Sequence, residues 1–146
     1  SWWPGVQAVD ARMLGSLHFR YGMMPCGGSI SMAELVRRAR RFNRPPETVR
    51  VFGGRPYSGC LVQCETEECI ITAVKKHVRR DSLVVRFFNC CSNRVVGVLR
   101  AGFPVESAYR TDLKETRKHA LKVKGRVVSA PAAPWEIVTV EVVFKR

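Results

Sequence analysis

The residues that could carry acid–base or metal chemistry are few and widely spaced in this chain. Hydrolytic chemistry usually needs a positioned pair of carboxylates, or a set of His and Asp side chains around a metal ion. No aspartate stands two residues from a histidine, and the acidic run at 65–68 is typical of a solvated turn. We therefore expect no catalytic residue and no independent catalysis. The residues considered are Asp10, Asp81, Asp112, His18, His77, His119, Glu65, Glu67 and Glu68.

Cysteine offers a second kind of chemistry, as a metal ligand, a disulfide or a spare thiol. Structural zinc sites usually combine two closely spaced ligand pairs, and Cys60, Cys64 and Cys69 have no second pair at that spacing. Cys60 and Cys64 fall on one face of a strand-like run, where cysteine acts as a small hydrophobe. The spacings also match no small disulfide framework. We expect buried or spare thiols, no stoichiometric zinc and no cofactor in this chain. The six cysteines are Cys26, Cys60, Cys64, Cys69, Cys90 and Cys91.

Exposed aromatic side chains are the residues through which a protein could stack on a sugar ring. Four are candidates for carbohydrate contact here, namely Trp2, Trp3, Tyr57 and Trp135. For Trp135 the alternative is packing in the core beside the last strand, because large aromatic side chains are highly buried on average. The sequence leaves both interpretations of Trp135 open.

The chain is strongly basic, with a formal net charge of +13 from 25 Lys and Arg against 12 Asp and Glu. Such a balance favours a polyanion partner. However, no aromatic residues interleave with the basic clusters, as binding of single strands would need, so we expect a solvated basic face and no nucleic acid partner. One cluster lies on a predicted helix and comprises Arg37, Arg38, Arg40, Arg41 and Arg44. The other straddles a turn and comprises Lys75, Lys76, His77, Arg79 and Arg80.

The elements that must position these residues are mostly short strands. Alternation is clearest in the last segment, where Val138, Val140 and Val142 share one face while Thr139 and Glu141 share a mixed face. Frequent turns and no long helical period predict an all-β fold, an antiparallel β-sandwich with one short α-helix. The stretch 112–124 is polar and is compatible with a hairpin or a loop. Predicted strands are 14–21, 49–52, 60–64, 70–74, 83–88, 95–99, 125–128 and 135–144.

The helix is predicted at about residues 32–42. Ser31 has the character of an N-cap, with Glu34 at the third helical position. Apolar residues at Leu35, Val36 and Phe42 then follow the helical period, and the prolines at 45 and 46 end the helix.

Length and composition limit the number of domains and the class of protein that this chain can be. A chain of 146 residues predicts one domain over 1–146, with a poorly defined lead-in at 1–13. With 46% hydrophobic and 25% charged residues the chain is typical of a folded protein. No apolar run approaches the roughly 20 residues of a membrane helix, and no signal peptide is recognisable. We expect a cytoplasmic location and no membrane partner. The absent initiator Met indicates a fragment or a processed product.

Six segments, taken in order, carry a resemblance to the C-terminal region of glycoside hydrolase family 38, the retaining, metal-dependent α-mannosidases. They span most of the chain between about residues 14 and 144. No single motif is specific, but their order is. The segments are 17–21, 39–45, 73–89, 95–99, 104–113 and 134–139.

This resemblance implies an accessory role. Family members carry their zinc ion and aspartate nucleophile in a large N-terminal α/β domain, and none of that set is recognisable here. We expect a C-terminal accessory domain that packs on a glycosidase catalytic domain and shapes its carbohydrate site. The alternatives are a free carbohydrate- or nucleic-acid-binding module and an orphan gene remnant without activity. The remnant interpretation is favoured by two departures from the family pattern, Cys90-Cys91 after Asn89 and Cys26 after a proline.

Overall fold

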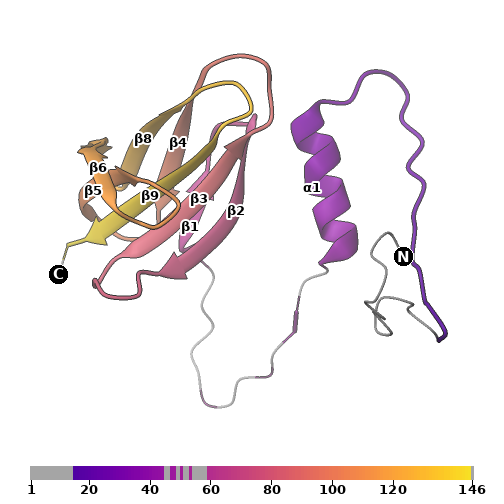
Figure 1. Ribbon diagram of the computed structural model, residues 1–146, viewed down its shortest axis with the longest axis horizontal. Coiled ribbons are helices and arrows are strands. Elements are labelled where there is room, and N and C mark those ends of the chain that lie inside the picture. The colour runs from indigo at the N-terminus through magenta and orange to yellow at the C-terminus, as the bar shows by residue number, and fades with distance from the viewer. Residues whose placement is uncertain (1–14, 45–46, 49, 51–52, 54–58, 146) are drawn as a thin grey trace, which may run out of the picture.

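Two antiparallel sheets packed face to face make up the β part of the chain (Figure 1). The computed structural model describes residues 15–44, 47–48, 50, 53 and 59–145. One sheet has the strand order β1-β4-β8-β7 and the other β2-β3-β9-β5-β6, so the predicted β-sandwich is confirmed. The strands are β1 Val62–Cys64, β2 Cys69–Lys76, β3 Leu83–Asn89, β4 Val95–Ala101, β5 Val105–Thr111, β6 Arg117–Ala120, β7 Lys122–Lys124, β8 Val127–Ala132 and β9 Ile137–Phe144.

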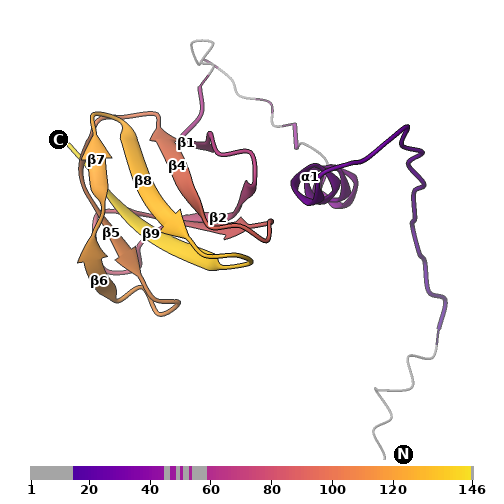
Figure 2. The same ribbon diagram turned by 90° about the horizontal axis from the view of Figure 1, so that it is seen from above.

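Figure 2 shows from above how the two sheets face each other, and the hydrophobic core lies between them. The predicted alternation of β9 is confirmed on this side, because Val138, Val140 and Val142 all belong to the core. Phe87 of β3 lies beside Val138 in the same sheet, Leu99 of β4 comes from the facing sheet, and both are almost fully buried. Burying branched and aromatic side chains of this size contributes about 1.5–3 kcal/mol each, so the sandwich depends mainly on this layer.

Gly97 of β4 lets the two sheets approach each other. A Cβ atom placed on Gly97 would lie 2.5 Å from the ring of Phe87, closer than any ordinary contact. Glycine in a strand often marks such a close approach. The large ring of Phe87 can therefore fill the space in front of β4 without pushing the sheets apart.

The single helix of the described residues, α1 Met32–Asn43, lies beside β2 (Figures 1 and 2). Its predicted extent and cap are confirmed, since the Ser31 hydroxyl accepts a hydrogen bond of 3.2 Å from the Glu34 amide. Ala33 and Val36 pack on Ile70, Phe88 and Cys90, in a small cluster separate from the main core. The helix therefore covers one edge of the five-stranded sheet.

Several predicted boundaries differ from the structure. Residues 15–21 form no strand and are exposed, because no strand of either sheet pairs with them. The strand predicted at 60–64 is reduced to β1, and Cys60 lies outside it and is exposed. The prediction at 49–52 falls mostly outside the described residues, as does the lead-in at 1–13. One strand has no counterpart among the predicted ones: β5 forms at 105–111, with polar side chains on its outer face.

The polar stretch 112–124 forms two edge strands that belong to different sheets. β6 pairs with β5 of the five-stranded sheet, and β7 pairs with β8 of the four-stranded sheet. Charged residues on edge strands discourage pairing with other chains, which accounts for the polar composition of this stretch. No helix that the structure describes is long and apolar enough to cross a membrane.

Candidate functional site

Trp135 is the only one of the four predicted carbohydrate-contact residues that lies within the described part of the chain. Trp2, Trp3 and Tyr57 fall outside it. Trp135 was placed at the start of the last strand by the sequence, but it lies in the turn between β8 and β9, and its side chain is 51% exposed. This exposure argues against the alternative of core packing.

The turn holds Trp135 in an uncommon backbone conformation. The Glu136 amide donates to the Ala133 carbonyl at 3.2 Å, which closes a four-residue turn with Pro134 and Trp135 in the middle. Trp135 has a φ of 59°, in the left-handed region where glycine is normally found. A bulky residue there costs about 1–3 kcal/mol. Strain of this kind is retained only where the surroundings fix it, and such strain is concentrated at functional sites.

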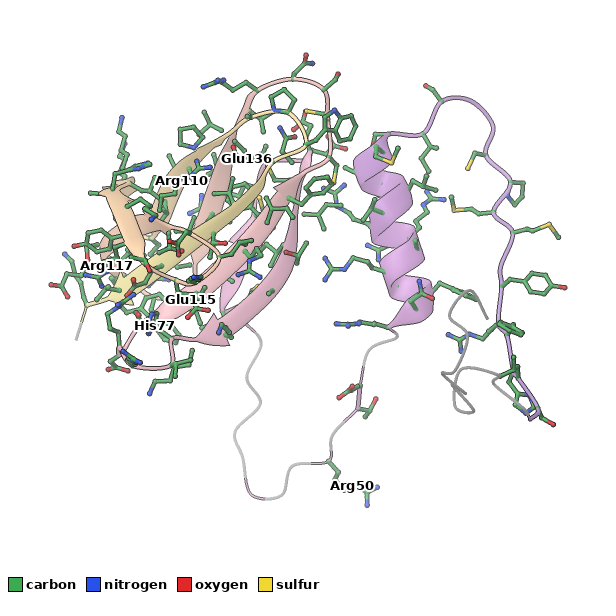
Figure 3. The ribbon with its side chains drawn as sticks, in the orientation of Figure 1. Arg50, His77, Arg110, Glu115, Arg117 and Glu136 are labelled. Carbon is green, nitrogen blue, oxygen red and sulfur yellow. The ribbon has the colours of Figure 1, made fainter. Side chains whose placement is uncertain are left out.

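Buried hydrogen bonds fix the turn from beneath. The side chain of Asn89 is fully buried, and its Nδ2 donates to the carbonyl oxygens of Ala133 at 2.8 Å and Asn93 at 2.9 Å. One oxygen of the Glu136 carboxylate accepts from the Ala133 amide at 2.7 Å, and the other accepts from Arg110. Arg110 also donates to the Pro131 carbonyl at 2.7 Å. Figure 3 shows Arg110 and Glu136 together at this end of the sandwich. These contacts make the turn a rigid support for the Trp135 ring.

Trp135 is part of an apolar surface on the outer face of the five-stranded sheet. Its ring centroid lies 6.5 Å from that of Phe88, at an angle of 36°. Phe88 is directly paired with Ile137, whose side chain is half exposed. Next along the same face, the Arg86 Nε donates to Thr139 Oγ1 at 3.1 Å. A flat apolar ring beside hydrogen-bonding groups can stack on the apolar face of a sugar and contact its hydroxyls.

Sequence reasoning named Trp135 and missed its neighbours. Phe88 and Ile137 were assigned to strands without a role, and Asn89, Arg110 and Glu136 were not singled out. The signal available was the mixed outer face of the last strand, which the alternation of β9 already placed opposite the core. The hydrogen bonds of Asn89 and Arg110 join residues far apart in sequence, and no local pattern predicts them.

At the other end of the same face, Glu141 forms a buried ion-pair network. Its side chain is 0% exposed. Arg80 donates to both carboxylate oxygens at 2.8 Å, Arg117 donates to both at 2.8 and 2.9 Å, and the Ser82 hydroxyl adds a bond of 2.7 Å. The Arg117 guanidinium also lies 4.0 Å from the centre of the Tyr109 ring. Every lone pair of the carboxylate is therefore engaged, and its role is structural.

The protonation equilibrium of Glu141 reflects these contacts. Burial raises the pKa of this carboxyl, but the hydrogen bonds from Arg117, Arg80 and Ser82 outweigh burial and hold the pKa far below its usual range. The sequence had placed Glu141 on a mixed face. It is buried because the turn at 77–82 and the loop before β6 fold over that part of the sheet.

The second basic cluster orders the turn that supplies Arg80. His77 is buried, and its Nδ1 accepts hydrogen bonds from the amides of Arg79 at 3.0 Å and Arg80 at 3.1 Å. Its Nε2 lies 3.7 Å from Glu115, which also pairs with Lys75 at 2.6 Å. In Figure 3, His77, Glu115 and Arg117 lie together in this region. These residues position one another rather than a ligand.

The first basic cluster, on α1, is divided between two roles. Arg37 and Arg40 donate to the carbonyl oxygens of Glu67 and Ile71 and so attach the helix to the sandwich. Arg38 pairs with Glu34 at 2.6 Å. Arg41 and Arg44 are exposed. The five arginines therefore do not form one continuous basic surface.

All six cysteines are described and carry free thiols. Cys60 and Cys64 were expected on one strand face, but only Cys64 lies in β1. Within the part of the chain that the structure describes, no three His, Cys, Asp or Glu side chains gather as a metal site would require. The expectation of no stoichiometric zinc stays a prediction.

Comparison of the sequence with models of protein families finds one match. The model of the glycosyl hydrolases family 38 C-terminal beta sandwich domain matches residues 68–140, from the beginning of β2 into β9. The match includes the Trp135 turn and ends one residue before Glu141. Comparison with curated proteins finds no match.

Replacing Glu141 by Gln should destabilise the fold. The variant leaves two guanidinium groups facing a neutral amide, a change that costs about 3–5 kcal/mol when a buried pair is broken. Because the folded-state pKa of Glu141 is lowered, its stabilisation is complete above the ordinary carboxyl value of about 4.3. It is lost as the pH falls below that value.

Urea unfolding of both proteins at neutral and acidic pH measures this effect. The difference between wild type and Glu141→Gln should be large at neutral pH and shrink on acidification. Glu106→Gln, at an exposed position of β5, is the matched control and should change stability by less than about 0.5 kcal/mol. A Glu141→Gln variant as stable as wild type at neutral pH would contradict the assigned network.

Proposed function

The chain belongs to glycosyl hydrolase family 38 through its C-terminal β-sandwich domain, and we propose that it is an accessory domain of an α-mannosidase-like glycosidase. In this proposal it packs on a catalytic domain and shapes the edge of the carbohydrate site. Zinc and the catalytic carboxylates would belong to that other domain. The observation that carries the proposal is a large exposed apolar surface formed by residues that precede the matched sandwich in sequence.

This surface is formed by residues 17–42. Of the described residues in this range only Ala33 is buried, although the range is rich in large apolar side chains. Contiguous apolar patches of this kind mark interaction sites in soluble proteins. The exposed residues are Leu17, Phe19, Tyr21, Met23, Met24, Met32, Leu35 and Phe42.

The extended segment before α1 and the helix itself form a continuous surface. Arg20 donates to the Phe42 carbonyl at 2.6 Å, and its guanidinium lies 4.7 Å from the centre of the Phe42 ring. Arg38 contacts the Met24 sulfur at 3.0 Å. A hollow between segment and helix is lined by Met23, Met24, Leu35 and Phe42. It has the shape to receive an apolar side chain from a partner.

A catalytic domain is the occupant that fits best. One side of α1 already packs on the sandwich through Ala33 and Val36. The exposed apolar side chains of residues 17–42 are therefore left for a partner outside the sandwich. In the family that this chain resembles, the catalytic domain precedes the sandwich in sequence, and the apolar surface is also formed by residues that precede the sandwich, which supports this choice of partner.

Contact with carbohydrate is proposed for Trp135 and the adjoining Phe88 and Ile137. The strained turn, its buried supports and the half-exposed ring support this assignment. The nucleic-acid alternative receives less support, because Arg37 and Arg40 of the helical cluster already bond the sandwich.

The docking surface is tested by mixing the chain with the catalytic domain of a family 38 α-mannosidase that lacks its own C-terminal region. Association should be measurable by analytical ultracentrifugation, and Leu35→Asp should weaken it at least about tenfold, or 1.4 kcal/mol, by burying a charge. The chain alone should not hydrolyse an aryl α-mannoside. Leu113→Asp, also at an exposed leucine, is the control and should bind like wild type.

Equal effects of Leu35→Asp and Leu113→Asp would contradict docking through residues 17–42. Hydrolysis by the chain alone, after removal of host glycosidases, would overturn the accessory role itself.

The role of Trp135 is tested with an α-mannose oligosaccharide added to the chain and followed by NMR. Trp135→Gly should weaken binding at least about tenfold. It should leave thermal stability close to wild type, because relief of about 1–2 kcal/mol of left-handed strain offsets loss of the Phe88 contact, about 0.5–1.5 kcal/mol.

Phe103→Ala removes a similarly exposed aromatic ring at another place on the surface and serves as the control. Retained sugar binding by Trp135→Gly would refute the proposed contact. A large loss of stability in that variant would assign the side chain to packing instead.

A further inference from the structure

A pair of thiols lies where the two sheets are joined by the chain. Cys64 is the last residue of β1, in the four-stranded sheet, and Cys69 is the first residue of β2, in the five-stranded sheet. Cys64 packs against the main core, to which Cys69 belongs. The two thiols are close enough that each shifts the pKa of the other, and the Cys64 thiol donates to the Thr66 carbonyl at 3.7 Å. Neither the family match nor the proposed function assigns a role to this pair.

The connection between the two cysteines is held in place from both sides. The Cys69 amide donates to the Thr66 carbonyl at 3.1 Å, and the Glu65 amide donates to the Val98 carbonyl at 2.8 Å. The Thr66 hydroxyl donates to the Val96 carbonyl at 2.7 Å and accepts from the Val98 amide at 2.9 Å. The thiols therefore remain neighbours through a fixed turn rather than by chance approach.

The two thiols differ in access and in acidity. Cys69 is buried, whereas Cys64 is partly exposed. Interaction with the neighbouring Cys69 thiol lowers the pKa of Cys64 to about 7, with the Thr66 backbone and Arg37 assisting and burial and Glu65 opposing. The same contact, together with burial, raises the pKa of Cys69. At neutral pH Cys64 is thus the nucleophilic partner, since the thiolate is the reactive form.

We propose that Cys64 and Cys69 form a redox-active dithiol that closes to a disulfide between the two sheets. With a small disulfide such as glutathione disulfide as oxidant, the Cys64 thiolate attacks one sulfur and releases one glutathione thiolate. The Cys69 thiol then loses its proton and attacks Cys64 in the mixed disulfide, which releases the second glutathione. Two protein thiols are oxidised and one glutathione disulfide is reduced to two thiols.

The other thiols are engaged elsewhere. Cys60 Sγ donates to the Val62 carbonyl at 3.1 Å, and Cys91 Sγ contacts Asn89 Oδ1 at 3.1 Å. Cys90 is buried on the side of α1, in the cluster with Ala33 and Ile70. None of these contacts joins one thiol to another.

The turn between the two cysteines is also hydrogen-bonded to the helix α1. Glu67, in the middle of that turn, accepts a hydrogen bond from Arg37 of α1 through its carbonyl oxygen. Closing the disulfide would draw the two ends of this turn together. It would thereby change the hydrogen bond between Arg37 and Glu67, which is one of the contacts that attach α1 to the sandwich.

The test oxidises the intact chain with glutathione disulfide at neutral pH, followed by acid quench and alkylation. Digestion after glutamate separates Cys64 from Cys69, because Glu65, Glu67 and Glu68 lie between them. We expect the two resulting peptides to stay linked until reduced, with the mass of two hydrogen atoms lost. Alkylation of Cys64 should accelerate as the pH rises through about 7.

The matched variants are Cys64→Ser and Cys60→Ser. In Cys64→Ser, no disulfide to Cys69 should form, whereas Cys60→Ser should behave like wild type. A disulfide in wild type that instead joins Cys69 to Cys90, or Cys90 to Cys91, would overturn the proposal. So would a protein that keeps all six thiols, or retains only a stable glutathione adduct on Cys64.

Discussion

The buried carboxylate of Glu141 determines how the outer face of the five-stranded sheet is divided. An ion in the interior is tolerated only when it is fully paired, so both Arg80 and Arg117 must stay over β9. Arg80 comes from the turn before β3 and Arg117 from the first residue of β6. Their attachment folds both loops over this end of the sheet. The other end, around Ile137, stays open.

Trp135 lies at the open end. Among the described residues, it is the only one that combines a left-handed backbone conformation with a large apolar side chain. Trp135 stands in the turn that enters β9, and the pairing of Phe88 with Ile137 continues its apolar surface onto the sheet. Asn89, Arg110 and Glu136 hold that turn from beneath. One strand therefore carries a closed, charged region and an open, aromatic region on the same face.

Sequence reasoning was most successful where the pattern is local. Period-two alternation located β9 and its core residues, and the Ser31 cap located α1. It failed where pairing decides the outcome, as at residues 15–21, which have strand-like alternation but no neighbouring strand, and at β5, whose polar residues hide its place beside β9. The burial of Glu141 and the support of Trp135 depend on arginines that are distant in sequence. Only the folded topology brings those side chains together.

Hydrogen–deuterium exchange of the chain, with and without a family 38 catalytic domain, tests the accessory role most directly. The amides of residues 17–42 should exchange faster in the free chain than in the complex, because the catalytic domain covers this apolar surface. The amides of the turn at 77–82 should be unchanged, since Glu141 already holds that turn. Protection at 77–82 without protection at 17–42 would contradict this account, as would exchange that the catalytic domain does not alter.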